Sequence, residues 1–238
     1  PKDYPGTIGL WVGSSEPTYY YENVLCRPDA VEKVGFLRAT MGNGRDYLAT
    51  RVSYKLGLRG PSIGLFAEEA TSLVAVSEAF SALVGNRCDM ALAGGVSIRS
   101  PLRGSHVQGV SGVCAHDGRC RPFDARADGS VPGDGAGIFV LKRLEDAYAD
   151  ADFIWAILRG VAVNNDGFLR QSRDVATVRG LTETMAMAQA VAGVEASLTP
   201  LKYFQAEWSA MSGVVWRRGL TATEARQAHS RNRGEIPR

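Results

Sequence analysis

Short apolar runs alternate with longer segments of helical periodicity along this chain, and this alternation restricts the fold more than any other feature. The runs with the length and composition of buried strands are residues 7–13, 62–66, 88–93, 137–144, 153–163 and 202–206. Helical spacing is found over residues 29–58, 69–84 and 177–191. Strands that alternate with helices predict an α/β layered fold.

Glycines and polar residues set the expected boundaries of these elements. The long helical segment should break near Gly42-Asn43-Gly44, and the strand over residues 88–93 should stop at Gly94-Gly95. A short acidic helix should join the strands over residues 137–144 and 153–163. Residues 97–134 are rich in Gly, Arg, Asp and Pro, which predicts a loop. A loop of this length inside a compact domain is usually functional.

The composition is that of a globular protein that needs no disulfide or metal to fold. The chain has 238 residues, of which 45% are hydrophobic and 22% charged, with a net charge of +2. We expect one domain over residues 1–215 and an arginine-rich tail over residues 216–238, which we interpret as a solvated end and not as a nucleic-acid surface. No apolar run approaches the ~18 residues of a membrane span. The four cysteines form no C-x-x-C pair, so a reduced, cytoplasmic protein is predicted.

Four segments, taken in order, resemble the β-ketoacyl synthase (ketosynthase) domain of modular polyketide synthases. They are NGRDYLATRVSYKLGLRGPS at 43–62, the segment 78–97 that ends in CDMALAGGVS, DGRCRPFDARADGSVPGDGAG at 117–137, and LRGVAVNNDG at 158–167. The resemblance implies a thiolase-like fold, in which two similar βαβαβ halves stack as five layers. It also implies a homodimer in which a strand near the nucleophile helix pairs across a two-fold axis. Only the central part of the family is matched, so we expect a fold that is incomplete at the N-terminus and in its second half.

The resemblance places Glu69 where the family has its nucleophilic cysteine. A condensing ketosynthase needs that cysteine at the start of a helix, where the helix dipole favours the thiolate. Phe66-Ala67-Glu68 replaces the usual Asp-Thr-Ala beside it. A carboxylate at this position cannot carry the acyl group, so the resemblance predicts that condensation is blocked.

The family's histidines are also missing. The first lies in a segment whose best counterpart here is QAEWSAM at 205–211, which puts Glu207 at the histidine position. The later lysine and second histidine have no counterpart. His106, His116 and His229 match no family position, and for His116 we expect a role on the loop surface.

Glu69 and Glu207 support two interpretations. If they face each other across the pocket that holds the nucleophile in the family, their pKa values can differ strongly. One carboxyl then acts as an acid and the other as a base in chemistry on a carrier-bound acyl chain. Alternatively, Glu68-Glu69 only begins a helix, because acidic residues are favoured in a first turn. From the resemblance we also predict that Phe66, Asn164 and Asp166 contact the substrate, although the local NNDG pattern indicates no more than a turn.

We expect no cofactor and no metal. Asp124, Asp128 and Asp134 fit no standard ligand spacing, and the glycines before residue 137 precede a strand, whereas a phosphate-binding loop precedes a helix.

Two classes of function remain open. The first is a condensation-incompetent accessory protein of polyketide biosynthesis, which binds an acyl carrier protein, a carrier-bound acyl thioester or a complete synthase. The second is a remodelled enzyme of the dehydratase, isomerase, cyclase or decarboxylase type that uses Glu69 and Glu207. We favour the first because every nucleophilic and histidine element of the family is absent.

Overall fold

The computed structural model describes most of the chain. The described segments are residues 3–98, 115–121, 124–131, 133–169 and 177–194, with the backbone of residues 211–217. Among the helices in these segments, none is long and apolar enough to cross a membrane.

A four-stranded sheet with the order β2-β1-β3-β4 forms the first half of the fold. β1 (Ile8–Ser14) pairs in parallel with both β2 (Ser62–Gly64) and β3 (Met90–Ser97). β4 (Gly135–Lys142) pairs antiparallel with β3 and forms one edge of the sheet. β1 lies in the interior of the sheet, and its residues from Ile8 to Gly13 are all buried, as its continuous apolar run predicts.

Three helices connect β1 to β2. They are α1 (Pro28–Val34), α2 (Phe36–Asn43) and α3 (Leu48–Leu56), which follow the π-helical turn η1 (Tyr20–Val24) and are interrupted by the 3-10 turn η2 (Arg45–Tyr47). Gly35 separates α1 from α2 with a φ of 86°, and Gly57 ends α3 in the left-handed conformation. α3 packs Ala49 against Leu10 and Val12 of β1, so it covers one face of the sheet.

α4 (Thr71–Val84) covers the other face of the same sheet. It follows the 3-10 turn η3 (Glu68–Ala70), so the helical region begins one residue before the predicted start at Glu69. The helix presents Ala75, Ala79 and Ala82 toward Trp11 of β1, all of them fully buried. Small side chains on the helix leave room for the indole, which fills the space between helix and sheet.

A second sheet and one more helix complete the layers. α5 (Leu144–Ala149) leads from β4 to β5 (Ile157–Asn164), which pairs antiparallel with β6 (Met211–Arg217). The turn η4 (Gly167–Leu169) precedes α6 (Val178–Ala192), which packs on β5. The two elements pack closely at Gly160, where a Cβ would lie 2.2 Å from the carbonyl oxygen of Ala188.

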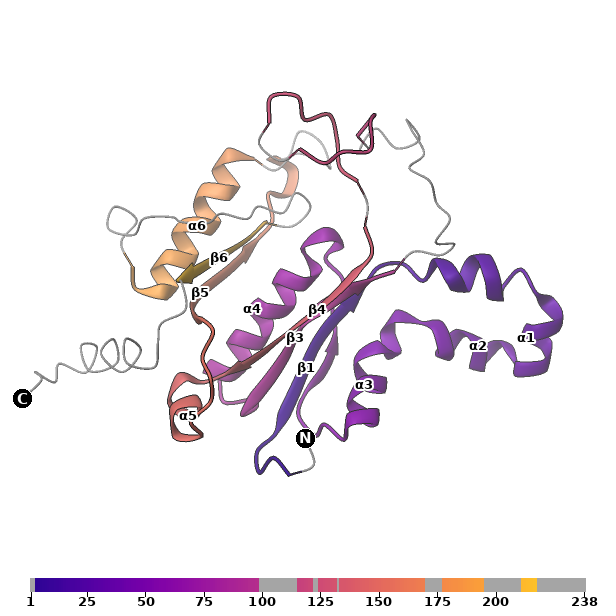
Figure 1. Cartoon of the computed structure of the whole chain (residues 1–238), viewed down its shortest axis with the longest axis horizontal. Coiled ribbons are helices and arrows are strands. Elements are labelled where there is room, and N and C mark those ends of the chain that lie inside the picture. The colour runs from indigo at the N-terminus through magenta and orange to yellow at the C-terminus, as the bar shows by residue number, and fades with distance from the viewer. Residues whose placement is uncertain are drawn as a thin grey trace, which may run out of the picture.

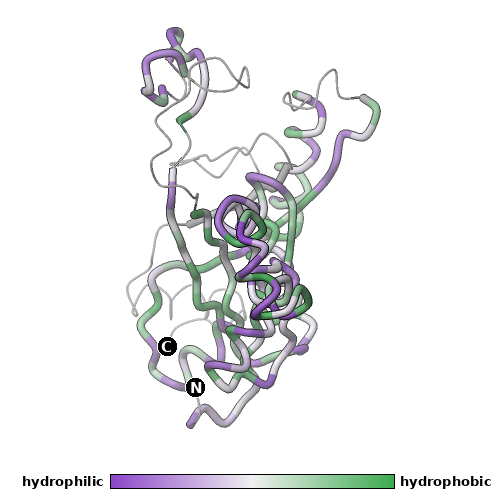
Figure 2. The backbone as a smooth tube through the Cα atoms, turned by 90° about the vertical axis from the view of Figure 1, so that its right-hand side faces the viewer, coloured by the Kyte–Doolittle hydropathy of each residue, from purple (hydrophilic) through white to green (hydrophobic). Residues whose placement is uncertain are grey.

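The layers stack as helix, sheet, helix, sheet and helix, in the order α3, first sheet, α4, second sheet and α6 (Figure 1). Leu158 of β5 packs against the cluster around α4, which joins the two halves. Hydrophobic residues follow the strands, whereas hydrophobic and hydrophilic residues alternate along the helices (Figure 2). The predicted α/β layered fold is confirmed.

Several predicted strand boundaries were wrong. β2 ends at Gly64 and not at residue 66, and β4 covers Gly135–Lys142 in place of residues 137–144. β3 does not stop at Gly94-Gly95 but continues to Ser97. Gly94 is required there by close backbone approach, since its Cβ would lie 2.0 Å from the carbonyl oxygen of Gly137 on β4. The strand predicted over residues 153–163 begins only at Ile157. Phe153 and Trp155 lie before it and are exposed, with their rings packed edge to face and their ring centres 4.9 Å apart.

Only part of the C-terminal predictions can be compared with the structure. The strand predicted over residues 202–206 lies outside the described residues. β6 was not predicted, and it extends to Arg217, two residues beyond the predicted domain limit at 215.

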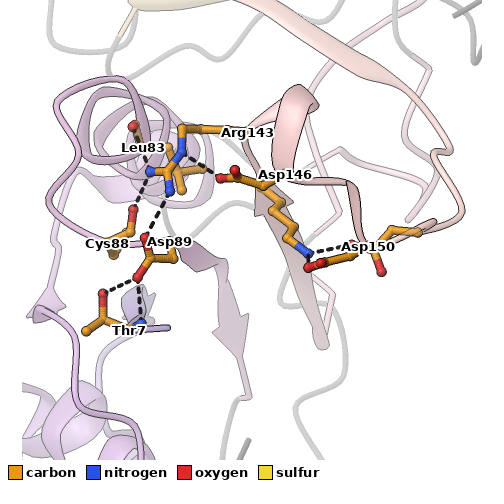
Figure 3. Close-up of polar contacts among 9 residues, drawn as sticks. Thr7, Leu83, Cys88, Asp89, Arg143, Asp146 and Asp150 are labelled. Carbon is orange, nitrogen blue, oxygen red and sulfur yellow. Dashed lines mark hydrogen bonds and ion pairs between the residues drawn. The ribbon is translucent and has the colours of Figure 1, made fainter. Parts of the chain in front are cut away.

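A polar network fixes the end of the first sheet at which the parallel strands begin (Figure 3). Arg143, which follows β4, donates to Asp89 (2.9 Å), Asp146 (2.7 Å) and the carbonyl oxygen of Cys88 (2.8 Å). Asp89 also accepts hydrogen bonds from the backbone and the hydroxyl of Thr7. These contacts, the Thr7 backbone bond first, lower the pKa of Asp89. The network therefore joins the starts of β1 and β3 to the β4–α5 connection.

Candidate functional site

The candidate site lies at the opposite end of the first sheet, where the parallel strands finish. The chain leaves β1 toward α3 on one face of the sheet, and it leaves β2 toward α4 on the other face. In open α/β sheets, ligands bind outside the carboxyl ends of the strands at such a divergence. Glu69 and Phe66 both lie in the connection between β2 and α4, and both are exposed.

The turn that carries Glu69 has an unusual backbone. Glu68 has a backbone φ of +50°, in the left-handed region that residues other than glycine rarely adopt. Thr71 closes the turn: its hydroxyl donates to the carbonyl oxygen of Glu68 (2.7 Å) and accepts from the amide of Ala67 (2.9 Å). Non-glycine residues in this conformation concentrate at functional sites. The turn places Glu69 at the amino end of α4 while its neighbour Ala70 is fully buried.

Gly13 brings the end of β1 into contact with this turn. A Cβ at position 13 would lie 2.1 Å from Cγ2 of Thr71 and 2.3 Å from the carbonyl oxygen of Leu65. Only glycine leaves room for these approaches. The glycine at the end of the first apolar run is therefore a packing requirement of the site.

Phe66 is held by two residues that the sequence pattern did not identify. The guanidinium carbon of Arg45 lies 4.6 Å from the centre of the Phe66 ring, and Arg45 also forms an ion pair with Glu16 at 2.6 Å. Guanidinium groups stack favourably on aromatic faces. The three residues come from the loop after β1, from η2 and from the loop after β2, so no local sequence pattern links them.

Asn164 and Asp166 lie at the end of β5 and anchor α6. The side-chain amide of Asn164 donates to the carbonyl oxygen of Gly180 (3.0 Å). The two carboxylate oxygens of Asp166 accept from the backbone and the hydroxyl of Thr177, which itself caps α6 by accepting from the amide of Gly180. These contacts position a helix, and they involve the groups that we predicted to bind substrate. Contact with a substrate stays a prediction for both residues.

The remaining predicted site residue is not covered by the structure. Glu207 lies outside the described residues, so its pairing with Glu69 stays a prediction. Within the described segments, no group of acidic, histidine or cysteine residues could hold a metal ion.

The described part of the long loop is organised by ion pairs. Arg121 binds Asp117 with both terminal nitrogens, and this hydrogen bonding holds the pKa of Asp117 at about 2. His116 lies at the surface, where its amide and its Nδ1 contact the carboxylate of Asp128. The loop position expected for His116 is thus observed.

The comparisons with known proteins agree with this fold. A family model described as the N-terminal domain of β-ketoacyl synthase matches residues 1–147. A phenolphthiocerol/phthiocerol polyketide synthase component of Mycobacterium tuberculosis is 39% identical over 203 residues, which is 83% of this chain and 14% of that protein. A hybrid PKS-NRPS synthetase TAS1 of Gloeophyllum trabeum is 37% identical over 194 residues, which is 80% of this chain and 12% of that protein.

Solved structures give the same result. Ketosynthase twelve of the bacillaene polyketide synthase of Bacillus amyloliquefaciens superposes with a TM-score of 0.70 at 27% identity, covering 79% of this chain and 33% of that one. The ketosynthase of module 1 of the bacillaene synthase from the same species superposes with a TM-score of 0.67 at 30% identity. It covers 80% of this chain and 34% of that one. The chain spans about a third of these ketosynthases and a much smaller share of the curated relatives.

The chain therefore belongs to the β-ketoacyl synthase N-terminal domain family and has the thiolase-like fold of ketosynthases.

Proposed function

We propose that this protein is a condensation-incompetent ketosynthase-like component of polyketide biosynthesis, which binds a carrier-bound acyl thioester without extending it. The observation that carries the proposal is the position of Glu69, exposed in the turn at the amino end of α4. The resemblance assigns this position to the family's nucleophilic cysteine. A carboxylate there is a poor acceptor for a thioester acyl group, since the anhydride formed would be more reactive than the thioester.

The surrounding architecture supports a binding role. Gly13 and Thr71 keep the turn closely packed, and Arg45 holds Phe66 beside it. A preserved turn without its nucleophile is suited to holding an acyl chain or a carrier protein. The proposed partners are an acyl carrier protein and either a second copy of this chain or a complete synthase, and the proposed location is the cytoplasm.

One observation favours the remodelled enzyme as a second candidate. The left-handed backbone of Glu68 keeps Glu69 on a constrained and exposed turn, which is an arrangement typical of catalytic groups. In that case Glu69, with Glu207 as the proposed second carboxylate, acts as an acid or base on the bound acyl chain.

A carrier-protein assay separates the two candidates. Acetyl-, malonyl- and 3-hydroxybutyryl-carrier proteins are incubated with the wild type and with Glu69→Gln. Binding is measured by calorimetry, and the acyl groups are compared by intact mass and by chromatography. The accessory role predicts binding with every acyl group unchanged. Loss of water or carbon dioxide, or a shifted retention time, that disappears in Glu69→Gln would establish the enzyme. Failure to bind any of the carriers contradicts the accessory role.

Restoring the cysteine tests whether the turn still supports the family's nucleophile. The alkylation rate of Glu69→Cys by iodoacetamide is compared with that of Glu68→Cys, and the modified peptide is identified by mass spectrometry. We expect about fivefold faster alkylation at position 69, because the amino end of α4 favours a thiolate. Equal rates at the two positions would show that the turn no longer activates a nucleophile.

A further inference from the structure

Thr71 begins α4, and its side chain turns back onto the connection that carries Glu69. Its hydroxyl donates to the carbonyl oxygen of Glu68 (2.7 Å) and accepts from the amide of Ala67 (2.9 Å). The backbone amide of Thr71 also donates to the carbonyl oxygen of Glu68. One residue therefore makes three hydrogen bonds to the two residues that precede Glu69.

These bonds fix the direction in which the backbone reaches Glu69. The carbonyl oxygen of Glu68 belongs to the peptide group that ends at the nitrogen of Glu69, so its two donors on Thr71 set the plane of that group. The preceding carbonyl oxygen, that of Ala67, accepts from the amide of Ala70 (3.1 Å). A left-handed residue other than glycine persists only where the surrounding structure holds it. Thr71 supplies such contacts both before and after Glu68.

The hydroxyl of Thr71 also serves an amide that the local sequence leaves without a cap. The first amides of a helical segment have no partner within the helix, and a serine, threonine, aspartate or asparagine at the cap position usually accepts from one of them. Ala67 occupies the cap position of η3 and has no side-chain acceptor. Thr71 reaches back to the amide of Ala67, as an acceptor from within the helix does in a capping box. The start of this helical segment therefore depends on a residue that follows Glu69.

The methyl group of Thr71 has a separate task. Its Cγ2 fills the space beside the end of β1, because a Cβ on Gly13 would lie 2.1 Å from it. Threonine is restricted at χ1, and one rotamer satisfies both the methyl contact and the hydroxyl bonds. The methyl group thus packs on the sheet while the hydroxyl holds the turn. Valine would keep the first contact and serine would keep the second.

We propose that Thr71 is the positioning residue of the site, whose hydroxyl holds the side chain at position 69 at the amino end of α4. The inference rests on the proposed function, in which Glu69 meets the acyl thioester, and it gives Thr71 no contact with the substrate. A negative group at position 69, carboxylate or thiolate, gains from the amino end of the helix only while the turn keeps it there.

The test on the turn uses a thiol as a reporter and needs no ligand. The thiol pKa of Glu69→Cys is obtained from the pH dependence of its alkylation by iodoacetamide, and the modified peptide is quantified by mass spectrometry. The measurement is repeated with Thr71→Val and with Thr71→Ser added. We expect alkylation at pH 7 to be about fivefold slower with valine, because the thiolate is no longer held at the helix end. Serine should retain most of the rate.

Thr182→Val is the matched control for the loss of a hydroxyl. Thr182 is exposed on α6, and its hydroxyl donates to the carbonyl oxygen of Val178 (2.8 Å). Its replacement should leave the rate at position 69 unchanged. Circular dichroism and urea unfolding confirm that each variant is folded, and a merely structural role of Thr71 would lower stability without moving the thiol pKa. An ordinary thiol pKa in Glu69→Cys, or the same pKa with valine and serine at position 71, overturns the proposal.

Carrier binding separates this inference from the proposed function. Calorimetry with acetyl-carrier protein compares the wild type with Thr71→Val and Thr71→Ser, all of which keep Glu69. We expect about fivefold weaker binding with valine and binding close to that of the wild type with serine. Equal binding by the valine variant and the wild type contradicts the inference. If the wild type binds no carrier, the proposed function fails, and the alkylation series still decides the role of Thr71.

Discussion

The two ends of the first sheet are built in opposite ways. Where the parallel strands begin, Arg143, Asp89 and Thr7 satisfy one another in a closed network. Where they finish, Glu68 has a left-handed backbone and Glu69 is exposed. The comparison shows that side-chain hydrogen bonds join the strands at one end, whereas an exposed acidic turn stands at the other.

The largest effect should come from breaking the network. Arg143→Met removes the ion pairs to Asp89 and Asp146 and leaves the carbonyl oxygen of Cys88 without its donor. We expect unfolding in urea to require about 2–4 kcal/mol less free energy, because several partly buried polar groups lose their partner together. Arg126→Met is the matched control, since its ion pair with Asp124 is exposed to solvent and should contribute little to stability. Similar losses in the two variants would contradict the importance of the network.

Adding a methyl group at the site end should have the next largest effect. Gly13→Ala places a Cβ against Thr71 and the backbone of Leu65, and we expect a loss of about 1–3 kcal/mol from overpacking. Gly42→Ala in α2 has open space around its Cβ, so it should stabilise the protein by about 0.5–1 kcal/mol. Thermal or urea unfolding of the pair measures the difference. If Gly13→Ala leaves the free energy of unfolding unchanged, the turn can move to accommodate the added methyl group.

Releasing the strain at the site should have a smaller effect of opposite sign. Glu68→Gly allows the left-handed φ without a side-chain penalty, and we expect a gain of about 0.5–1 kcal/mol. Glu68→Ala removes the same side-chain interactions but keeps the Cβ, so it should be about 1 kcal/mol less stable than Glu68→Gly. If the glycine variant is no more stable than the alanine variant, the left-handed turn is not strained.

The smallest effect should be on how stability declines at acid pH. Because the folded protein lowers the pKa of Asp89 from 3.8, the unfolded state binds more protons as the pH falls toward and below that value. The stabilisation by Asp89 is present above pH 3.8 and is lost as the pH falls through its lower folded pKa. Asp89→Asn should therefore have a shallower decline of stability between about pH 5 and 2 than the wild type. Parallel curves for the two proteins would mean that Asp89 titrates alike in the folded and unfolded chain.

Much of the fold could be predicted from the sequence, and less of the site. The strand at β1 and the helices α4 and α6 follow from periodicity, because each buries a regular apolar face. The contacts of Phe66 could not be predicted, since Arg45 and Glu16 are distant in the chain. Asp166 was recognised as part of a turn, but its bonds to Thr177 depend on how α6 packs on β5.

The sequence by itself determined the alternation of strands and helices, the glutamate at position 69 and the glycine near the end of β1. Only the tertiary structure decided the strand order, the placement of α3 and α4 on opposite faces of the first sheet and the contacts of Phe66. Each of these depends on packing between segments that are far apart in the chain.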